Sequence, residues 1–481
     1  MKVKKKKFKD RALIQKRLTL VVWTIVVVFF ILILRLSYIM IVKRDEYSSR
    51  AEEQWTSEVS IDARRGRILD RNGVELAVSA NVYRVDFDLN SVRQYLKNNS
   101  LTNADIAGKI ADAVGMEENK VMEKLETKLA SGANAGSATL IRRIEKESAD
   151  KVNNLNIDGV IVSPDTKRYY PKGEFLAHVL GSTNVDGQGL TGVELQYNEY
   201  LSGVPGVRIS EIERNEENLS YTISNFTEPI DGKDVTLTTD SKIQAIAEKV
   251  AEKGLVDNQA KRVSIMVMNP NNGEILAMVN KPDFDPNNAF DGFEDFSGET
   301  DGEKLQKMWR NSLVNDTFEP GSIFKILTEA IALNEGLVNV TDTFTCNGNI
   351  CTNSGKSYAH GTLTVNKAFE VSCNDIFAKL GQLIGYENLL KYTTNLGLYN
   401  KVLGLAGENR EEAVGVMPKL TDGVSNFAIG QCVTVTPLQI AGAVNAIVND
   451  GIYIKPSLIE AIVDDDNNVI ENIQNEENRI F

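Results

Sequence analysis

Residues 318–328 decide the fold of the domain around them, and they read Phe318-Glu319-Pro320-Gly321-Ser322-Ile323-Phe324-Lys325-Ile326-Leu327-Thr328. A Pro-Gly turn brings Ser322 to the start of an apolar segment, and Lys325 follows three residues later, where a helix would place it on the same face. The spacing predicts a helix after Ser322 that ends near Gly336. Its apolar stripe is predicted to consist of Ile323, Ile326, Leu327, Ala330 and Leu333.

Ser322 and Lys325 lie at the border of this stripe, and they form a candidate nucleophile and base. Partial burial lowers the pKa of a lysine amine, so the neutral amine can take a proton from a hydroxyl. The start of a helix also favours an oxyanion. The chain has two histidines, His178 and His360, which leaves few places for a Ser-His-Asp triad. The pattern alone is weak, because residues 148–151 match it without an apolar stripe, and an ordinary core helix is the alternative.

The N-terminus combines a basic tail with a long apolar run. Residues 1–17 carry nine Lys or Arg and one Asp, about +8, which leaves about −21 for the rest of a chain of net charge −13. Leu18 to Leu34 is apolar-rich, Arg35 interrupts, and the run continues to Val42, which suits a membrane span. The basic charge predicts a cytoplasmic tail and a body outside the membrane. A cleaved signal peptide is the alternative, although no clear cleavage site follows. The acidic body argues against nucleic-acid binding.

The four cysteines, Cys346, Cys351, Cys373 and Cys432, are too few for a disulfide framework in 481 residues. With two histidines they also argue against a structural zinc site. Cys346 and Cys351 can pair locally in an oxidising compartment, and free buried thiols are the alternative.

The rest of the sequence predicts a mixture of helices and strands and no further catalytic or binding motif. A glycine-rich turn at 187–194 lacks the spacing of a phosphate-binding loop. The segments from about Glu228 onward predict an α+β domain. The predicted elements are a charged stalk at 45–54, a hairpin with an Asn-Gly turn at 64–77, two or three surface helices at 102–135, a strand at 235–239, a helix capped by Asp240 that runs to Gly254, strands at 263–268 and 275–279, and a helix that begins with the capping box Thr436–Gln439 and stops at Asp450-Gly451.

A second motif, Ser372-Cys373-Asn374, lies fifty positions after Ser322 and precedes an apolar run. A second hydroxyl near Lys325 can relay a proton to a leaving group, and an amide can hold a substrate carbonyl. Ser-x-Asn is common and occurs also at 79–81 and 182–184, so the weight of this motif comes from its order and spacing relative to Ser322.

Together these motifs resemble the class B penicillin-binding proteins, the bacterial peptidoglycan transpeptidases, and within them the division and sporulation branch of Gram-positive bacteria. The resemblance runs along the whole chain. It implies a basic cytoplasmic tail at 1–17, a transmembrane helix at 18–42, an elongated pedestal at 43–225 and a transpeptidase domain like that of penicillin-binding proteins and serine β-lactamases at 226–481. The matching features are the single anchor, the R-G-x-I-x-D-R-N-G-x-x-L-A signature at Arg65–Ala77, the glycine-rich segment Gly187–Glu194, the Pro-Gly-Ser-x-x-Lys and Ser-x-Asn boxes, Arg310-Asn311 and Gly430-Gln431.

The resemblance also implies a reaction and its residues. Ser322 would attack the penultimate D-Ala carbonyl of a stem peptide, and Lys325 would be its base. Ser372 would pass the proton to the leaving amine, and Asn374 would bind the substrate amide. Penicillins would acylate Ser322. The implied partners are a membrane glycosyltransferase and division proteins, and no metal or organic cofactor is implied.

One family feature is missing from these residues. The third box of the family, Lys-Thr-Gly or Lys-Ser-Gly, does not occur in residues 1–481. It is expected beyond Phe481, so the transpeptidase domain reads as C-terminally incomplete and residues 1–481 alone as inactive or nearly so. A non-catalytic scaffold of a cell-wall synthesis complex is therefore the alternative function, and a penicillin sensor of the same fold is a third.

Overall fold

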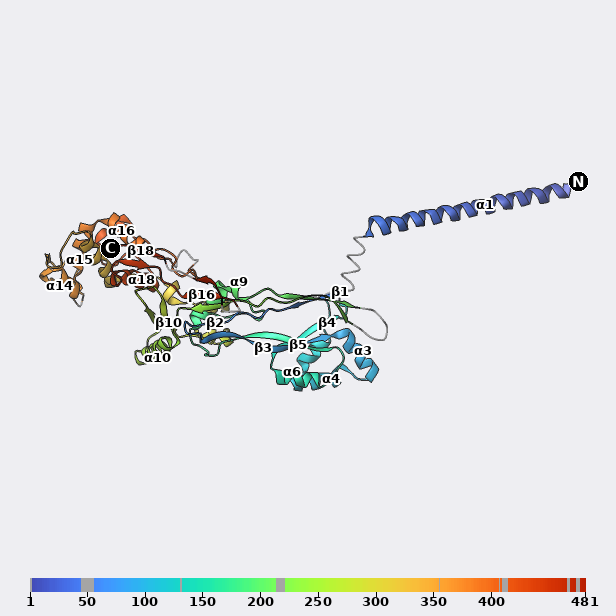
Figure 1. Ribbon diagram of the computed structural model, residues 1–481, viewed down its shortest axis with the longest axis horizontal. Coiled ribbons are helices and arrows are strands. Elements are labelled where there is room, and N and C mark those ends of the chain that lie inside the picture. The colour runs from blue at the N-terminus through green and yellow to red at the C-terminus, as the bar shows by residue number, and fades with distance from the viewer. Residues whose placement is uncertain are drawn as a thin grey trace. The chain divides into compact units, whose positions relative to one another are not determined.

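The computed structural model forms two compact units, Met1–Ile61 with Pro205–Pro229 and Asp62–Val204 with Ile230–Phe481 (Figure 1). The predicted stalk at 45–54 lies outside the described residues. The described residues are 2–44, 56–129, 132–212, 221–353, 355–405, 407–408, 414–464, 468–472 and 476–481.

The first unit contains a long apolar helix. Helix α1 (Lys2–Ser37) continues into a π-helical turn, η1 (Tyr38–Val42). Its apolar part, Lys16–Val42, has 27 residues, and none of its most apolar window is buried. At 1.5 Å per residue this part is about 40 Å long, enough for the roughly 30 Å hydrocarbon core of a bilayer. Among the described residues it is the one helix that is long and apolar enough to cross a membrane, so it suits a membrane anchor.

The same unit contains a three-stranded antiparallel sheet. Its order is β1-β6-β7, in which β6 pairs with both β1 and β7. The central strand β6 and its neighbour β7 lie between the two chain segments of the second unit, whereas β1 precedes both segments. The strands are β1 (Thr56–Ile61), β6 (Gly206–Ile212) and β7 (Tyr221–Thr227).

The second unit is built around a seven-stranded sheet of order β17-β16-β8-β2-β3-β4, in which β5 also pairs with β3. The predicted hairpin at 64–77 is confirmed as β2 and β3, with Gly73 in the turn at φ +77°. Strand β2 also pairs in parallel with β8, so this hairpin joins the N-terminal strands to strands of the C-terminal half. The strands are β2 (Ile68–Leu69), β3 (Glu75–Asp88), β4 (Ser137–Ile144), β5 (Val160–Tyr169), β8 (Asp234–Leu237), β16 (Ile459–Val463) and β17 (Val469–Asn472).

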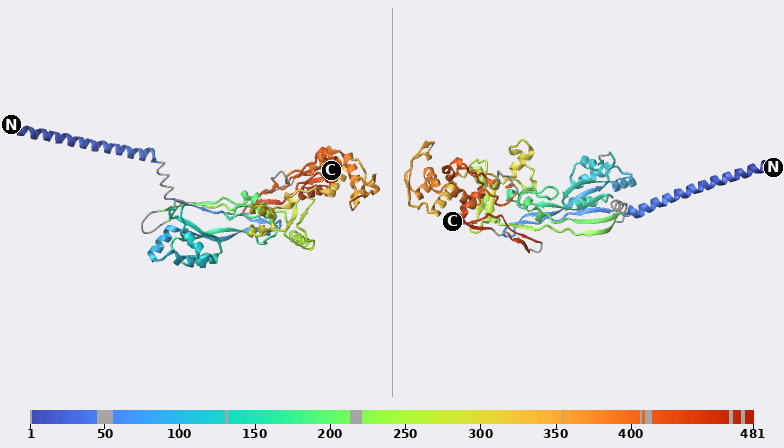
Figure 2. Two further views of the ribbon diagram at one scale, coloured as in Figure 1. Left: turned by 180° about the vertical axis from the view of Figure 1, so that it is seen from behind. Right: turned by 90° about the horizontal axis from the view of Figure 1, so that it is seen from above.

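Helices α3, α4 and α6 lie along one face of strands β3, β4 and β5 (Figures 1 and 2). Their shared core includes Val85, Phe87, Ile106 and Ile110, all fully or almost fully buried. The predicted surface helices at 102–135 are confirmed as α4 and α5. The helices of this part are α3 (Leu89–Asn99), α4 (Asn103–Val114), α5 (Glu118–Leu125), α6 (Lys146–Asn153), α7 (Ala177–Leu180), α8 (Gly192–Gln196) and α9 (Asn198–Leu201).

The following segment is a helix packed on a hairpin. The carboxylate of Asp240 accepts hydrogen bonds from the backbone N–H groups of Lys242 and Ile243, so the predicted cap is confirmed. Helix α10 runs to Asp257, three residues beyond the predicted end, and packs Ala247 and Ala251 on the β9-β10 hairpin. The elements are α10 (Ser241–Asp257), β9 (Val263–Met268), β10 (Ile275–Lys281), the 3-10 turns η2 (Pro286–Asn288) and η3 (Phe293–Asp295), α11 (Asp301–Met308) and α12 (Ser312–Asn315).

The last part is mainly helical and has its own core, which includes Phe324, Leu327, Ile376, Phe377 and Phe427. The predicted capping box is confirmed in both directions between Thr436 and Gln439. With the sheets described above, these helices confirm the α+β class. The elements are η4 (Gly321–Phe324), α13 (Lys325–Asn334), β11 (Thr343–Cys346), β12 (Thr352–Asn353), β13 (Lys356–Ser357), β14 (Gly361–Thr364), α14 (Val365–Glu370), α15 (Asn374–Ile384), α16 (Tyr386–Asn395), η6 (Leu420–Asp422), α17 (Val424–Ala428), α18 (Pro437–Val448), β15 (Ile452–Ile454) and β18 (Glu477–Arg479).

Candidate active site

Ser322 lies in the 3-10 turn η4, directly before helix α13. Gly321 adopts φ +53°, a left-handed conformation that glycine reaches without strain. The helix ends at Asn334, and Gly336 follows with φ +65°, so the predicted stop is confirmed. The turn therefore presents an exposed serine at the N-terminal end of a helix whose first residue is Lys325.

The predicted apolar stripe of this helix is wrong, because the buried face is shifted by about one residue along the chain. Ile323 is 47% exposed, whereas Phe324, Leu327 and Ile331 are buried. Both sets of residues fit helical spacing, so periodicity alone cannot choose between them. The ring of Phe324 packs against Phe427 at a centroid distance of 5.4 Å, and this contact selects the later set.

Ser372 lies in the tight turn between α14 and α15, at φ +53°. A non-glycine residue in this region is strained and persists only where the surroundings impose it. Here the N–H of Ser372 donates to Phe369 O at 2.9 Å, and the N–H of Cys373 donates to Ala368 O at 2.8 Å. These bonds close the turn and hold the Ser372 hydroxyl toward Lys325.

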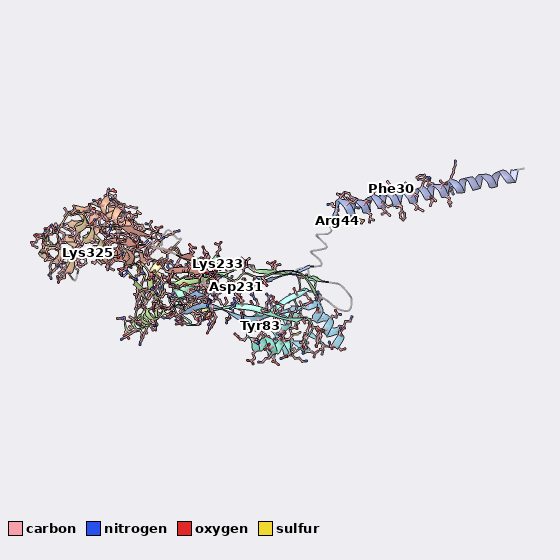
Figure 3. All side chains as sticks on the ribbon, viewed as in Figure 1. Phe30, Arg44, Tyr83, Asp231, Lys233 and Lys325 are labelled. Carbon is pink, nitrogen blue, oxygen red and sulfur yellow. The ribbon has the colours of Figure 1, made fainter. Side chains whose placement is uncertain are left out.

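The structure brings all four predicted site residues together around the amine of Lys325. This amine lies 3.3 Å from Ser322 Oγ, 2.9 Å from Ser372 Oγ and 2.5 Å from Asn374 Oδ1. It also donates to Ser372 O at 2.8 Å, and the two hydroxyl oxygens are 3.1 Å apart. Figure 3 labels Lys325 among the helices of the C-terminal part. One nucleophile, one amine and a second hydroxyl are thus linked by hydrogen bonds.

Lys325 is 1% exposed, whereas Ser322 and Ser372 are exposed. Burial lowers the pKa of the Lys325 amine to about 8, and the nearby thiols of Cys351 and Cys373 oppose the shift in part. About a tenth of such an amine is neutral at pH 7, so it can accept a proton from a hydroxyl. The arrangement can perform nucleophilic attack by Ser322 on an acyl group that approaches from solvent.

The segment before helix α18 supports the serine turn. The N–H of Gly321 donates to Gly430 O at 2.9 Å, and Thr328 Oγ1 donates to Ala428 O at 2.8 Å. Gly430 has φ +75°, and a Cβ there would strike the backbone of Gly321. Gly430 is therefore needed for close backbone contact behind Ser322.

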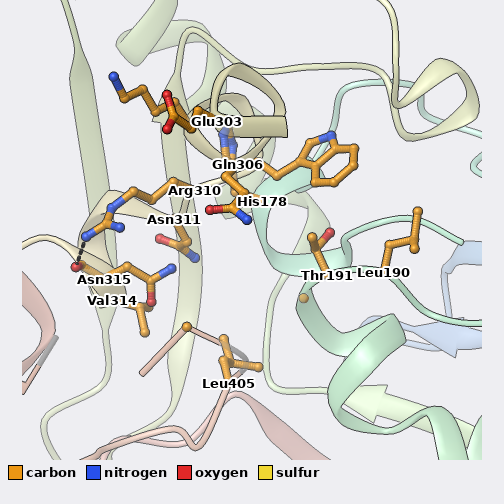
Figure 4. Close-up of a pocket in the computed structure, with 14 residues that line it drawn as sticks. His178, Leu190, Thr191, Glu303, Gln306, Arg310, Asn311, Val314, Asn315 and Leu405 are labelled. Carbon is orange, nitrogen blue, oxygen red and sulfur yellow. Dashed lines mark hydrogen bonds between the residues drawn. The ribbon is translucent and has the colours of Figure 1, made fainter. Parts of the chain in front are cut away.

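Arg310 and Asn311 lie apart from these four residues and line a cavity of about 530 Å³ with His178, Thr191 and Asn315 (Figure 4). The guanidinium of Arg310 pairs with Asp316 and donates to Asn315 O at 2.5 Å. The side chain of Asn311 caps α12. These contacts shape the segment that precedes the serine turn.

Cys351, Cys373 and Phe377 also lie at the site, although the sequence did not predict them there. The ring of Phe377 lies 5.6 Å from the Lys325 amine, and both thiols are buried close to it. The position of Cys373 between Ser372 and Asn374 was the available signal. No pattern in the sequence indicates that Cys351 lies close to the amine of Lys325.

Two known domain families together match most of the chain. The Penicillin-binding Protein dimerisation domain matches residues 60–237, and the Penicillin binding protein transpeptidase domain matches residues 263–480. The chain is 34% identical over 463 residues to stage V sporulation protein D of Bacillus subtilis, covering 94% of this chain and 68% of that protein. It is 28% identical over 432 residues to peptidoglycan D,D-transpeptidase FtsI of Escherichia coli K12, covering 87% of this chain and 68% of that protein.

A solved structure shares the fold. The crystal structure of penicillin binding protein 2X from Streptococcus thermophilus superposes with a TM-score of 0.65 at 23% identity, over 88% of this chain and 63% of that one. With the two domain matches and the 34% identical relative, the chain belongs to the class B penicillin-binding proteins.

Proposed function

We propose that this chain is a membrane-anchored peptidoglycan D,D-transpeptidase that works through an acyl-enzyme on Ser322 and is inhibited by penicillins. The observation that carries the proposal is the hydrogen-bonded trio of Ser322 Oγ, Lys325 Nζ and Ser372 Oγ, with separations of 2.9–3.3 Å, in a penicillin-binding protein transpeptidase domain.

In the proposed reaction, Ser322 Oγ attacks the penultimate D-Ala carbonyl while its proton passes to the neutral amine of Lys325. Collapse of the tetrahedral intermediate breaks the peptide bond, and Ser372 relays a proton from Lys325 to the leaving amine, which departs as D-Ala. An amine of a neighbouring stem peptide then attacks the ester, regenerates Ser322 and forms the cross-link. Asn374, whose Oδ1 lies 2.5 Å from the Lys325 amine, binds the substrate amide.

The proposed division of the chain follows from the same assignment. Residues 1–17 form a basic cytoplasmic tail, 18–42 the transmembrane helix, 43–225 the pedestal and 226–481 transpeptidase sequence. The charge of about +8 before Leu18 supports a cytoplasmic N-terminus and an extracellular body, where a membrane glycosyltransferase and division proteins are the proposed partners. Protease added to intact spheroplasts should digest the body and spare the tail; protection of the body would refute this orientation.

Labelled penicillin tests the reaction in the protein expressed from its own gene, with any residues encoded after Phe481. Ser322→Ala should abolish covalent labelling. Ser148→Ala is the matched control, because Ser148 lies in α6 in the same Ser-x-x-Lys pattern, but Lys151 there pairs with Glu147 at 2.8 Å. Undiminished labelling of the Ser322 variant would refute the assignment of the nucleophile. A wild-type protein that takes no label would favour the scaffold function.

A further inference from the structure

Three of the four cysteines lie together with one of the two histidines, next to the candidate active site. The ligand atoms of Cys346, Cys351, His360 and Cys373 all lie within 4.8 Å of one another. The three cysteines are buried, and His360 is half-buried. The sequence argued against a structural zinc site because the chain has only four cysteines and two histidines. The fold nevertheless brings three of these cysteines and one histidine together.

The four residues come from separate elements. Cys346 is the last residue of β11, and Cys351 directly precedes β12. His360 directly precedes β14, which pairs with β11, and Cys373 is the N-cap of α15. Their spacing along the chain is irregular, so the cluster forms only when the hairpins fold onto the turn that carries Ser372 and Asn374.

The distances match a tetrahedral zinc site. With Zn–S bonds of about 2.3 Å and Zn–N bonds of about 2.0–2.1 Å, tetrahedral geometry puts two sulfurs about 3.8 Å apart and a sulfur and a nitrogen about 3.6 Å apart. Cys346 Sγ lies 3.7 Å from Cys351 Sγ, which lies 3.6 Å from Cys373 Sγ. Cys346 Sγ lies 3.5 Å from Nδ1 of His360. A disulfide would need a sulfur separation of about 2.0 Å and would leave the third thiol without a covalent partner.

The surroundings suit metal-bound thiolates. The backbone N–H of His360 points at Cys346 Sγ from 3.4 Å, and that of Asp375 points at Cys351 Sγ from 3.3 Å. Such donors offset thiolate charge and orient the ligands. The Asp375 carboxylate accepts from the N–H groups of Asn349 and Ile350 at 2.9 and 2.6 Å, which fixes the loop before Cys351 against α15.

We propose that Cys346, Cys351, His360 and Cys373 bind one zinc ion in a closed, four-coordinate structural site. Soft thiolate and imidazole ligands in a tetrahedral set favour zinc. Binding releases the three thiol protons to solvent and requires no redox step. The zinc site holds the hairpins of residues 343–364 to the turn of Ser372 and Asn374, so it positions the candidate active site without touching the substrate.

The test measures zinc in the 481-residue chain, purified in detergent with a reducing agent. Elemental analysis should find about one zinc per chain. Cys351→Ser and Cys373→Ser should lose it, and Cys432→Ser should keep it, because Cys432 is an exposed free thiol outside the cluster. Equal zinc in the Cys373 variant and the wild type, or no zinc in the wild type even after incubation with Zn²⁺, would overturn the proposal.

Two measurements on the wild type do not depend on how the variants fold. Replacement of zinc by Co²⁺ should produce thiolate-to-cobalt charge-transfer absorption and the intense visible bands of tetrahedral Co²⁺. For protein purified without a reducing agent, a thiol count after denaturation should give four; a count of two would indicate a disulfide in the cluster and overturn the proposal. Neither measurement uses penicillin, so failure here is distinguishable from failure of the proposed transpeptidase activity.

Discussion

Glu194→Gln should be among the most destabilising single substitutions in the second unit. Glu194 is fully buried and lies between two guanidinium groups, with Arg65 Nε and Arg168 Nε each 2.6 Å from one of its carboxylate oxygens. Tyr170 donates to the same carboxylate at 3.2 Å. Desolvation by burial pushes the pKa of Glu194 upward, but the two guanidinium groups outweigh it and hold this pKa below its usual range.

The substitution removes the negative charge that pairs with both arginines. Glutamine keeps the shape of the side chain but loses the negative charge, and its NH₂ group places a donor against a guanidinium donor. Breaking a buried ion pair by removing one partner costs about 3–5 kcal/mol. Total stabilities are about 5–15 kcal/mol, so this is a large fraction. For a unit of about 400 residues, 1 kcal/mol shifts the unfolding temperature by roughly 1–2 °C, so a loss of about 4 kcal/mol lowers it by roughly 4–8 °C.

Thermal unfolding of the detergent-solubilised chain measures this effect. Glu147→Gln is the matched control, because Glu147 pairs with Lys151 at 2.8 Å on the surface of α6 with its side chain 82% exposed. Exposed pairs contribute little, so the control should unfold at the wild-type temperature. A Glu194 variant that also unfolds within about 2 °C of the wild type would refute the reasoning, because the buried charges would then be compensated by other groups.

Three further outcomes follow from the site and from His178. Lys325→Met should slow penicillin acylation by roughly 10²–10⁴-fold, the usual contribution of a positioned base, and a wild-type rate would exclude Lys325 from that role. Cys373→Ser should slow acylation by penicillin, whereas Cys432→Ser should not. Equal rates in the two variants would show that the cysteine cluster does not position the active-site turn. Burial lowers the pKa of His178 to about 4. As the pH falls, this histidine therefore takes up a proton in the unfolded chain before it does so in the folded chain. About 3 kcal/mol of folding stability, fully present above pH 6.5, is lost as the pH falls to 4. The free energy of unfolding, measured with urea at pH 7 and pH 5, should fall less in His178→Gln than in the wild type. Equal losses in the two proteins would contradict the assignment.

Local patterns in the sequence predicted much of the fold. The Asn-Gly hairpin, the Asp240 cap and the capping box at Thr436 depend on neighbours in the chain, and all three are confirmed. The apolar stripe of α13 was wrong because two sets of residues fit the same period. Long-range packing, such as the contact between Phe324 and Phe427, distinguishes them.

Ion pairs between residues far apart in the chain could not be predicted from the sequence. The signature at Arg65–Ala77 and the glycine-rich segment were recognised as family features without a physical role. The structure gives them one, because Arg65 of the first and Glu194 of the second form a buried ion pair 129 positions apart. Charge, spacing and periodicity carry no information about which buried arginine meets which buried carboxylate.

The Ser-x-Asn turn shows why a motif of three residues cannot define an active site by itself. Ser372 is held at φ +53°, which costs about 1–3 kcal/mol for a residue with a side chain. The structure offsets this cost with groups behind the turn: the backbone bonds of Ser372 and Cys373, and a Cys373 side chain that is completely buried. The other Ser-x-Asn tripeptides, at 79–81 and 182–184, lie in β3 and in the segment after α7, and neither of their serines has a positive φ. The position of the second hydroxyl therefore depends on the residue between Ser372 and Asn374, which faces the cysteine cluster, as much as on the two residues that define the motif.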